Sequence, residues 1–147
     1  MNWGLLLLTF LAGSGLVVQV GLNAAIGQAL GRPIFGAVVN FMVGLVALLV
    51  FVAATRVPLP SRDALTAAPA WAWLGGLMGA LYVATVTIAG PRLGAVLMLA
   101  LTVAGQMIAS VIFDHYGLLG FAQQPVTMTR VIGVLLLCAG IALVAIR

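Results

Sequence analysis

Five apolar stretches, each about 20 residues long, run through the sequence with almost no charged residue inside them. A helix of about 20 residues is what is needed to cross about 30 Å of hydrocarbon. Only 5% of the 147 residues are charged, whereas a water-soluble domain carries roughly 25%. Such a chain could not cover a water-facing surface. We therefore predict an all-α membrane protein in which the bilayer is the solvent of the apolar side chains.

The breaks between the stretches set the bounds of five predicted transmembrane helices, at residues 3–22, 34–54, 70–89, 93–113 and 127–146. The first helix can continue to Leu30, because Gly31-Arg32-Pro33 is the first interruption of its apolar run. Residues 55–69 and 114–125 are expected to form polar surface loops, and Gly90-Pro91 to force a tight turn.

Residues 1–147 are expected to form a single membrane domain, with no soluble domain at either end. The N-terminal apolar run is expected to be a retained first helix. No basic residue precedes it, whereas a signal peptide has a positive n-region.

The charged residues argue against nucleic-acid binding and leave the orientation in the membrane balanced. Six arginines and two aspartates give a net charge of +4, but they are spread singly and form no cluster that would neutralise phosphates. If successive loops alternate sides, the arginines divide equally: Arg56, Arg62 and Arg130 on the side of the N-terminus, Arg32, Arg92 and Arg147 on the other.

Equal arginine numbers give almost no orientation signal by the positive-inside rule. One interpretation is a chain with a single, weakly specified orientation. The other is a chain that inserts both ways and pairs with an inverted copy. Two copies of a five-helix unit would then form a ten-helix transporter of inverted repeats, completed as an antiparallel homodimer.

Polar side chains inside the apolar stretches are candidates for a substrate path, because buried amides and hydroxyls must find partners in a membrane. Gln19 and Asn23 are four residues apart and share a helix face. A stripe at the same spacing follows in the fourth span: Thr102, Gln106, Ser110 and Asp114. Interhelical hydrogen bonding is the alternative role for the amides. The predicted substrate-binding residues are Gln19, Asn23, Tyr82, Thr102 and Gln106.

Small residues predict where helices pack closely. Asn40 lies between Gly36 and Gly44 at four-residue spacing, which favours a helix contact over a place in the substrate path. The same packing role is expected of Gly75 and Gly79 in the third span and of Gly133 and Gly140 in the fifth. The Thr87 hydroxyl is expected to bond a carbonyl of its own helix.

Asp114 and His115 are the acid and the imidazole that stand nearest to a predicted span. Asp114 lies about 31 Å along a helix that begins at Leu93, hence at the membrane interface. The pair can be an ordinary interfacial anchor. It can also be a gate or a proton-sensitive latch, since an imidazole ordinarily changes charge between about pH 5 and 8.

No enzymatic site, cofactor or metal is expected. Ser110, Asp114 and His115 lie at one helix end, within six residues, and cannot assume the geometry of a catalytic triad there. The sequence has no glutamate and so no His-Glu-x-x-His motif. Its single cysteine, Cys138, forms no internal disulfide and is expected to be a small buried apolar residue.

Several short motifs carry a resemblance to a known family. They are Gln19-x-x-x-Asn23, Asn40-Phe41-x-x-Gly44, Trp73-Leu74-Gly75-Gly76, Gly90-Pro91-Arg92-Leu93-Gly94, Gly105-Gln106 and Asp114-His115-x-Gly117-Leu118. In their order and spacing the chain resembles the small YdcZ-type exporters of the drug/metabolite transporter superfamily over nearly its full length. The resemblance implies a half-sized, five-helix transporter of the bacterial inner membrane. Members occur singly, as pairs or as fused ten-helix chains.

The predicted function is export of a small molecule by alternating access, with an antiparallel second copy, membrane lipids and the substrate as partners. The related small multidrug resistance proteins carry a glutamate in their first helix, but this chain has no carboxylate there. Neutral or zwitterionic metabolites are therefore favoured, although the Tyr82 ring could still hold a cation. The alternatives are a non-transporting subunit that needs a different partner chain, and a small channel or lipid-handling protein.

Overall fold

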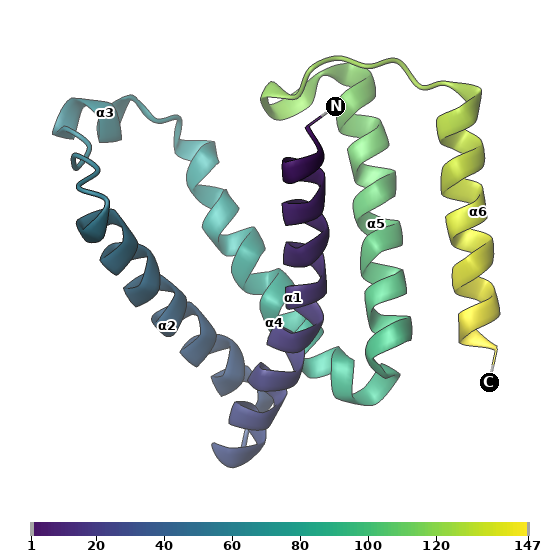
Figure 1. The fold of residues 1–147 in the computed structure, drawn as a ribbon, viewed down its shortest axis with the longest axis horizontal. Helices are drawn as coiled ribbons and strands as arrows, with labels where there is room; N and C mark the ends of the chain where they lie inside the picture. The colour runs from purple at the N-terminus through teal and green to yellow at the C-terminus, as the bar shows by residue number, and fades with distance from the viewer. Residues whose placement is uncertain (1, 147) are drawn as a thin grey trace. The chain divides into compact units, whose positions relative to one another are not determined.

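The computed structural model describes residues 2–146, and within that range it contains helices and no strand (Figure 1). The elements are α1 (Trp3–Ala29), α2 (Pro33–Ala54), α3 (Arg62–Ala67), the 3-10 helix η1 (Ala70–Trp73), α4 (Leu74–Leu93), α5 (Ala95–Tyr116), the 3-10 helix η2 (Leu118–Gly120) and α6 (Met128–Ala145). Five helical segments are long and apolar enough to cross a membrane: α1, α2, η1 with α4, α5 and α6. The predicted all-helical class with five candidate spans is confirmed.

Large apolar side chains point outward along all of these helices. Leu8 and Met42 are each 63% exposed and Leu136 is 68% exposed. A monomer in water rarely leaves apolar patches of this extent open, whereas lipid accepts them. Cys138 is exposed too, contrary to the expectation of burial, because α6 packs on α5 along one face and its other faces stay open.

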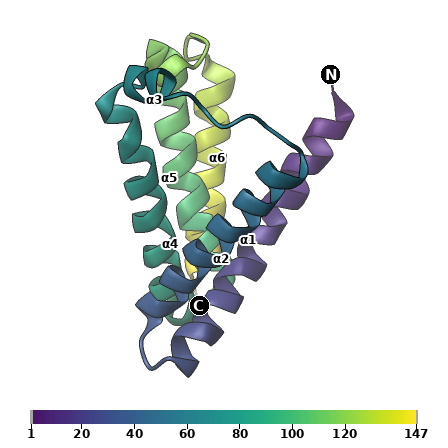
Figure 2. The ribbon, with the colours of Figure 1, turned by 90° about the vertical axis from the view of Figure 1, so that its left-hand side faces the viewer.

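The chain divides into two compact units, Met1–Arg92 and Leu93–Arg147, with the boundary at the end of α4. In the first unit, α1 and α2 meet at the turn that joins them and diverge toward their other ends (Figure 1). In the second unit, α5 and α6 run antiparallel and side by side, as Figures 1 and 2 both show. Arg147, one of the arginines sorted above, lies outside the described residues.

The tight turn predicted at Gly90-Pro91 is wrong. α4 continues through Pro91 to Leu93. Proline cannot donate a hydrogen bond to the carbonyl four residues earlier, but its φ is close to that of a helix, so the last turn can still form. The chain turns instead at Gly94, whose φ of 81° and ψ of 152° fall in a region that only glycine adopts readily.

Three further boundaries differ from the predicted ones. α1 runs to Ala29 rather than ending at residue 22, as the uninterrupted apolar sequence to Leu30 allowed. The loop at 55–69 contains the short helix α3, which Ser61 caps by accepting a hydrogen bond from the Ala64 amide at 3.1 Å. α5 extends to Tyr116, so Asp114 and His115 lie in its last turn.

Candidate functional site

The backbones of α1 and α2 approach each other closely near the turn that joins them. A Cβ added to Gly36 would lie 2.0 Å from the carbonyl oxygen of Asn23, and one added to Gly27 would lie 2.8 Å from the Cα of Pro33. Real Cβ atoms do not approach other atoms so closely, so both contacts require glycine. Small residues at such crossings let membrane helices pack backbone to backbone.

One helical turn beyond this contact, two amides join α1 to α2. The Nε2 of Gln19 donates a hydrogen bond to the Oδ1 of Asn40, with 2.8 Å between the atoms. Gln19 and Asn23 are four residues apart on α1, and Gly36 and Asn40 four apart on α2. The two antiparallel helices therefore pair in register, Asn23 with Gly36 and Gln19 with Asn40. Asn40, predicted to serve packing, takes part in this polar contact.

Alongside the contact and past the amide pair, α1 and α2 leave an open cleft of about 500 Å³. Its polar side chains are Gln19, Asn23 and Asn40, and none of its lining residues is charged. The other lining residues are small or apolar: Gly15, Val18, Leu22, Ile26, Val39, Val43, Gly44 and Ala47. This is the geometry expected of a small-molecule site, which is mostly apolar with a few placed polar groups.

Asn23 also connects α1 to α4. It is 3% exposed, and its Nδ2 donates to the Oγ1 of Thr87, which is fully buried, at 3.5 Å. Thr87 was expected to bond its own helix, but the hydrogen bond that the structure shows comes from Asn23. This hydrogen bond could not be predicted from the sequence. Thr87 has no polar residue three or four positions away that would indicate which face of its helix meets α1.

The remaining nominated residues lie outside the amide pair. Tyr82 is half-buried on α4. The hydroxyl of Thr102 donates to the carbonyl of Met98 on its own helix at 2.9 Å. Gln106 is exposed on α5, in the other compact unit. A cavity shared by Gln106 with Gln19 and Asn23 stays a prediction.

The glycines expected to pack helices differ in their surroundings. A Cβ on Gly79 would meet only the ring of Phe41, at 3.9 Å. For the others, no described residue outside the neighbouring turns of the same helix lies within 4 Å of an added Cβ: Gly44, Gly75, Gly133 and Gly140. Their packing role stays a prediction, to be tested on contacts with a second copy.

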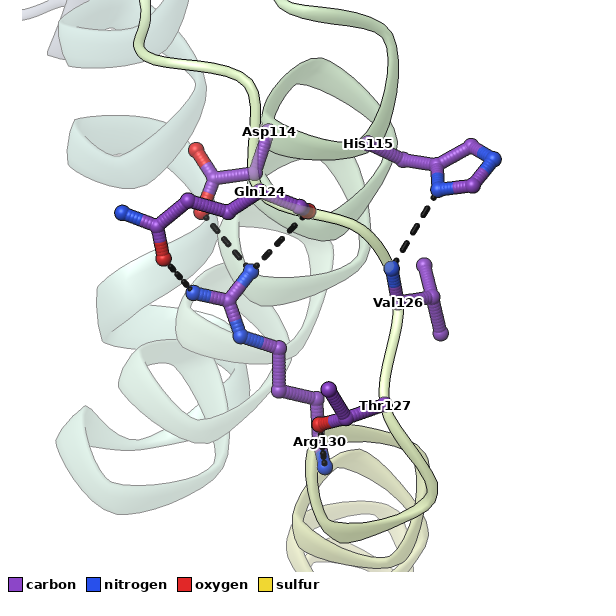
Figure 3. A network of polar contacts seen from close by, with 6 residues as sticks. All are labelled: Asp114, His115, Gln124, Val126, Thr127 and Arg130. Atoms are coloured by element: carbon purple, nitrogen blue, oxygen red, sulfur yellow. Dashed lines mark hydrogen bonds and ion pairs between the residues drawn. The ribbon is translucent and has the colours of Figure 1, made fainter.

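A second polar cluster closes the end of the α5–α6 hairpin (Figure 3). The Nη1 of Arg130, in the first turn of α6, forms an ion pair with the Oδ2 of Asp114 at 3.2 Å. The guanidinium also donates to the side-chain oxygen of Gln124. The backbone amide of Gln124 in turn donates to the Asp114 carbonyl at 2.7 Å. The ion pair thus fixes the loop between the two helices.

His115 holds the other edge of the same loop. Its Nδ1 accepts a hydrogen bond from the backbone amide of Val126 at 3.2 Å (Figure 3). Its carbonyl accepts one from the Gln123 side chain at 3.2 Å. An imidazole nitrogen accepts only when it carries no proton. The arrangement therefore requires a neutral His115 with its proton on Nε2.

Neither Arg130 nor Gln124 was predicted from the sequence to lie in this cluster. For Arg130 one signal was available. Asp114 ends one span and Arg130 begins the next, and consecutive helices are usually neighbours in space, so that their adjoining ends can meet. The same reasoning does not identify Gln124, because the path of the loop depends on its backbone conformation.

Comparison with known proteins gives a family. The family model described as "Putative inner membrane exporter, YdcZ" matches residues 4–143, which is nearly the whole chain and includes both polar clusters. The match confirms the resemblance carried by the sequence motifs. No curated protein and no solved structure matches the chain. Among residues 2–146 no group of three or more histidine, cysteine, aspartate or glutamate side chains is placed to hold a metal ion.

Proposed function

Because the chain belongs to the YdcZ family of inner membrane exporters, we propose that it exports small neutral or zwitterionic metabolites as an inverted dimer working by alternating access. The observation that carries the proposal is the cleft between α1 and α2, which combines three amides with apolar walls. Membership of this family does not favour the two alternatives, a non-transporting subunit or a small channel or lipid-handling protein.

The absence of charge in the cleft supports the substrate class. A molecule with a net charge would lose water on entry without meeting an opposite charge among the lining residues, which is costly in an apolar environment. Amides can replace the water around neutral polar groups by hydrogen bonds. We propose that Tyr82, Thr102 and Gln106 extend the substrate path, and that Asp114 and His115, with Arg130, form a gate at the end of α5.

Pairing with an inverted copy would supply the second half of the transporter. Five spans place the two ends of the chain on opposite sides of the membrane, and two such units in opposite orientations have the arrangement of inverted repeats. Rocking of one unit against the other around a central site would then expose the substrate to each side in turn.

Topology reporters test the inverted dimer directly. Two reporters are fused to the C-terminus in turn, one active only on the inner side of the membrane and one only on the outer side. If the chain inserts both ways, both fusions should give a signal. Two arginines added to the loop that contains Arg56 should bias the distribution toward one orientation, because the balance of basic residues becomes unequal. A single fixed orientation of the unmodified chain would exclude an inverted homodimer.

Export itself is measurable before the substrate is known. Cells that express the protein should lose at least one small uncharged or zwitterionic metabolite to the medium faster than cells that express Gly44→Leu, in which a side chain enters the cleft. Equal metabolite profiles in both strains, at equal protein levels, would count against an exporter.

A further inference from the structure

Gln19 and Asn40 form one of the two hydrogen bonds that a pair of side-chain amides can form. Two amides that face each other fully exchange two hydrogen bonds, but here Gln19 donates to Asn40 and no bond returns. Among the described residues 2–146, neither the Oε1 of Gln19 nor the Nδ2 of Asn40 has a hydrogen-bond partner, and neither atom is fully buried. The pair therefore leaves one acceptor and one donor next to each other, at the cleft.

Two glycines face the space beside this pair. Gly15 and Gly44 continue the register of the α1–α2 contact by one further turn, and both line the cleft. Apart from the neighbouring residues of its own helix, no atom of residues 2–146 lies within 4 Å of a Cβ added at either position. Apolar side chains, among them Val18, Leu22 and Val43, form the walls around the space.

We infer that the cleft binds a neutral small molecule through a hydroxyl or carboxamide group. That group donates to the Oε1 of Gln19 and accepts from the Nδ2 of Asn40, while an apolar body occupies the space beside Gly15 and Gly44. A group that only accepts, such as an ester, can satisfy one of the two atoms. A carboxylate can satisfy only the donor and brings an uncompensated charge. That the bound molecule is the exported substrate rests on the proposed function; the binding chemistry does not.

Polarity argues for this occupant over a lipid tail. A hydrocarbon chain in the cleft would leave the acceptor of Gln19 and the donor of Asn40 without partners, and each unsatisfied polar group in an apolar environment costs about 1–3 kcal/mol. The uncharged lining argues equally against an ionic ligand.

The test measures thermal unfolding of the full chain in lipid nanodiscs with three probes that share one apolar body: phenylacetamide, methyl phenylacetate and phenylacetate. A ligand that binds the folded state raises the unfolding temperature by mass action. Phenylacetamide should raise it at concentrations at least about tenfold lower than the ester or the anion, because a site built for a hydrogen-bonding group discriminates against analogues that lack it.

Two matched variants locate the effect. Gly44→Leu fills the cleft and should abolish the shift, whereas Gly133→Leu, at an equally open position on α6, should retain it. Asn40→Leu should remove the preference for the amide, since the donor is gone. Size-exclusion chromatography and the unfolding temperature without probe establish that each variant is folded.

Three results would overturn the inference: equal shifts with all three probes, shifts that persist in Gly44→Leu, or no shift with any probe. Dissociation of a dimer by Gly44→Leu would overturn it as well, because a second copy would then occupy the cleft. Discrimination among the probes in a chain of fixed topology would leave the inference standing and reject the inverted dimer. Export without discrimination among the probes would reject the inference and leave the proposed export standing.

Discussion

Replacing Gly36 by alanine should separate α1 from α2 and remove most of the folded protein. The new methyl carbon would lie 2.0 Å from the carbonyl oxygen of Asn23 and 2.8 Å from its carbonyl carbon. Both are backbone atoms, so no side chain can rotate away and the helices themselves must move. Overpacking that can relax costs about 1–3 kcal/mol, and we expect at least the upper end of that range. Thermal unfolding in detergent and the yield of monodisperse protein measure it.

Gly44→Ala is the matched control on the same helix. It lies two turns beyond Gly36, and in the part of the chain that the structure describes no atom outside the adjoining turns of α2 is within 4 Å of its added Cβ. An alanine there should leave stability unchanged or raise it by roughly 0.5–1 kcal/mol, since glycine is unfavourable inside a helix. If the two substitutions had equal effects, the close contact between Asn23 and Gly36 would not exist in the membrane.

This pair of glycines shows where the sequence alone stops. Their common spacing around Asn40 predicts a contact face on the second helix, and that helix is observed. The spacing treats Gly36 and Gly44 alike, however, and only the angle between α1 and α2 distinguishes them. Near the turn the helices touch; farther along they diverge, so the first glycine meets a backbone and the second lines a cleft.

The helical spans were predictable for a simpler reason. Lipid imposes length and apolarity on each crossing, and both are properties of the sequence itself. Contacts between spans depend on rotation and register, which an all-round apolar helix specifies weakly. Hence Asn23 and Thr87 could each be identified as polar residues within a span. The hydrogen bond between them, from α1 to α4, could not be predicted. Pro91 misled for a local reason, since its φ fits a helix and α4 continues for two residues beyond it although its nitrogen cannot donate a hydrogen bond.

Reversing the charge at position 114 should open the α5–α6 loop. In Asp114→Arg a second guanidinium would face Arg130, whose Nη1 is 3.2 Å from the Asp114 carboxylate. The two side chains are 33% and 30% exposed, so water screens part of the repulsion. Loss of the pair and the new repulsion together should cost about 2 kcal/mol. The backbone amide of Gln124, which donates to the Asp114 carbonyl, should exchange its hydrogen faster.

The exchanged pair, Asp114→Arg with Arg130→Asp, separates the ion pair from other effects of the substitution. It restores opposite charges and keeps the number of loop arginines, so the balance that governs orientation does not change. Rescue should be incomplete, because Gln124 presents oxygens to Arg130 that an aspartate cannot use. We expect the exchanged pair to recover at least about half of the lost stability. An exchanged pair no more stable than Asp114→Arg alone would mean that the network around Gln124, and not the charge of Asp114, holds Arg130 and the loop.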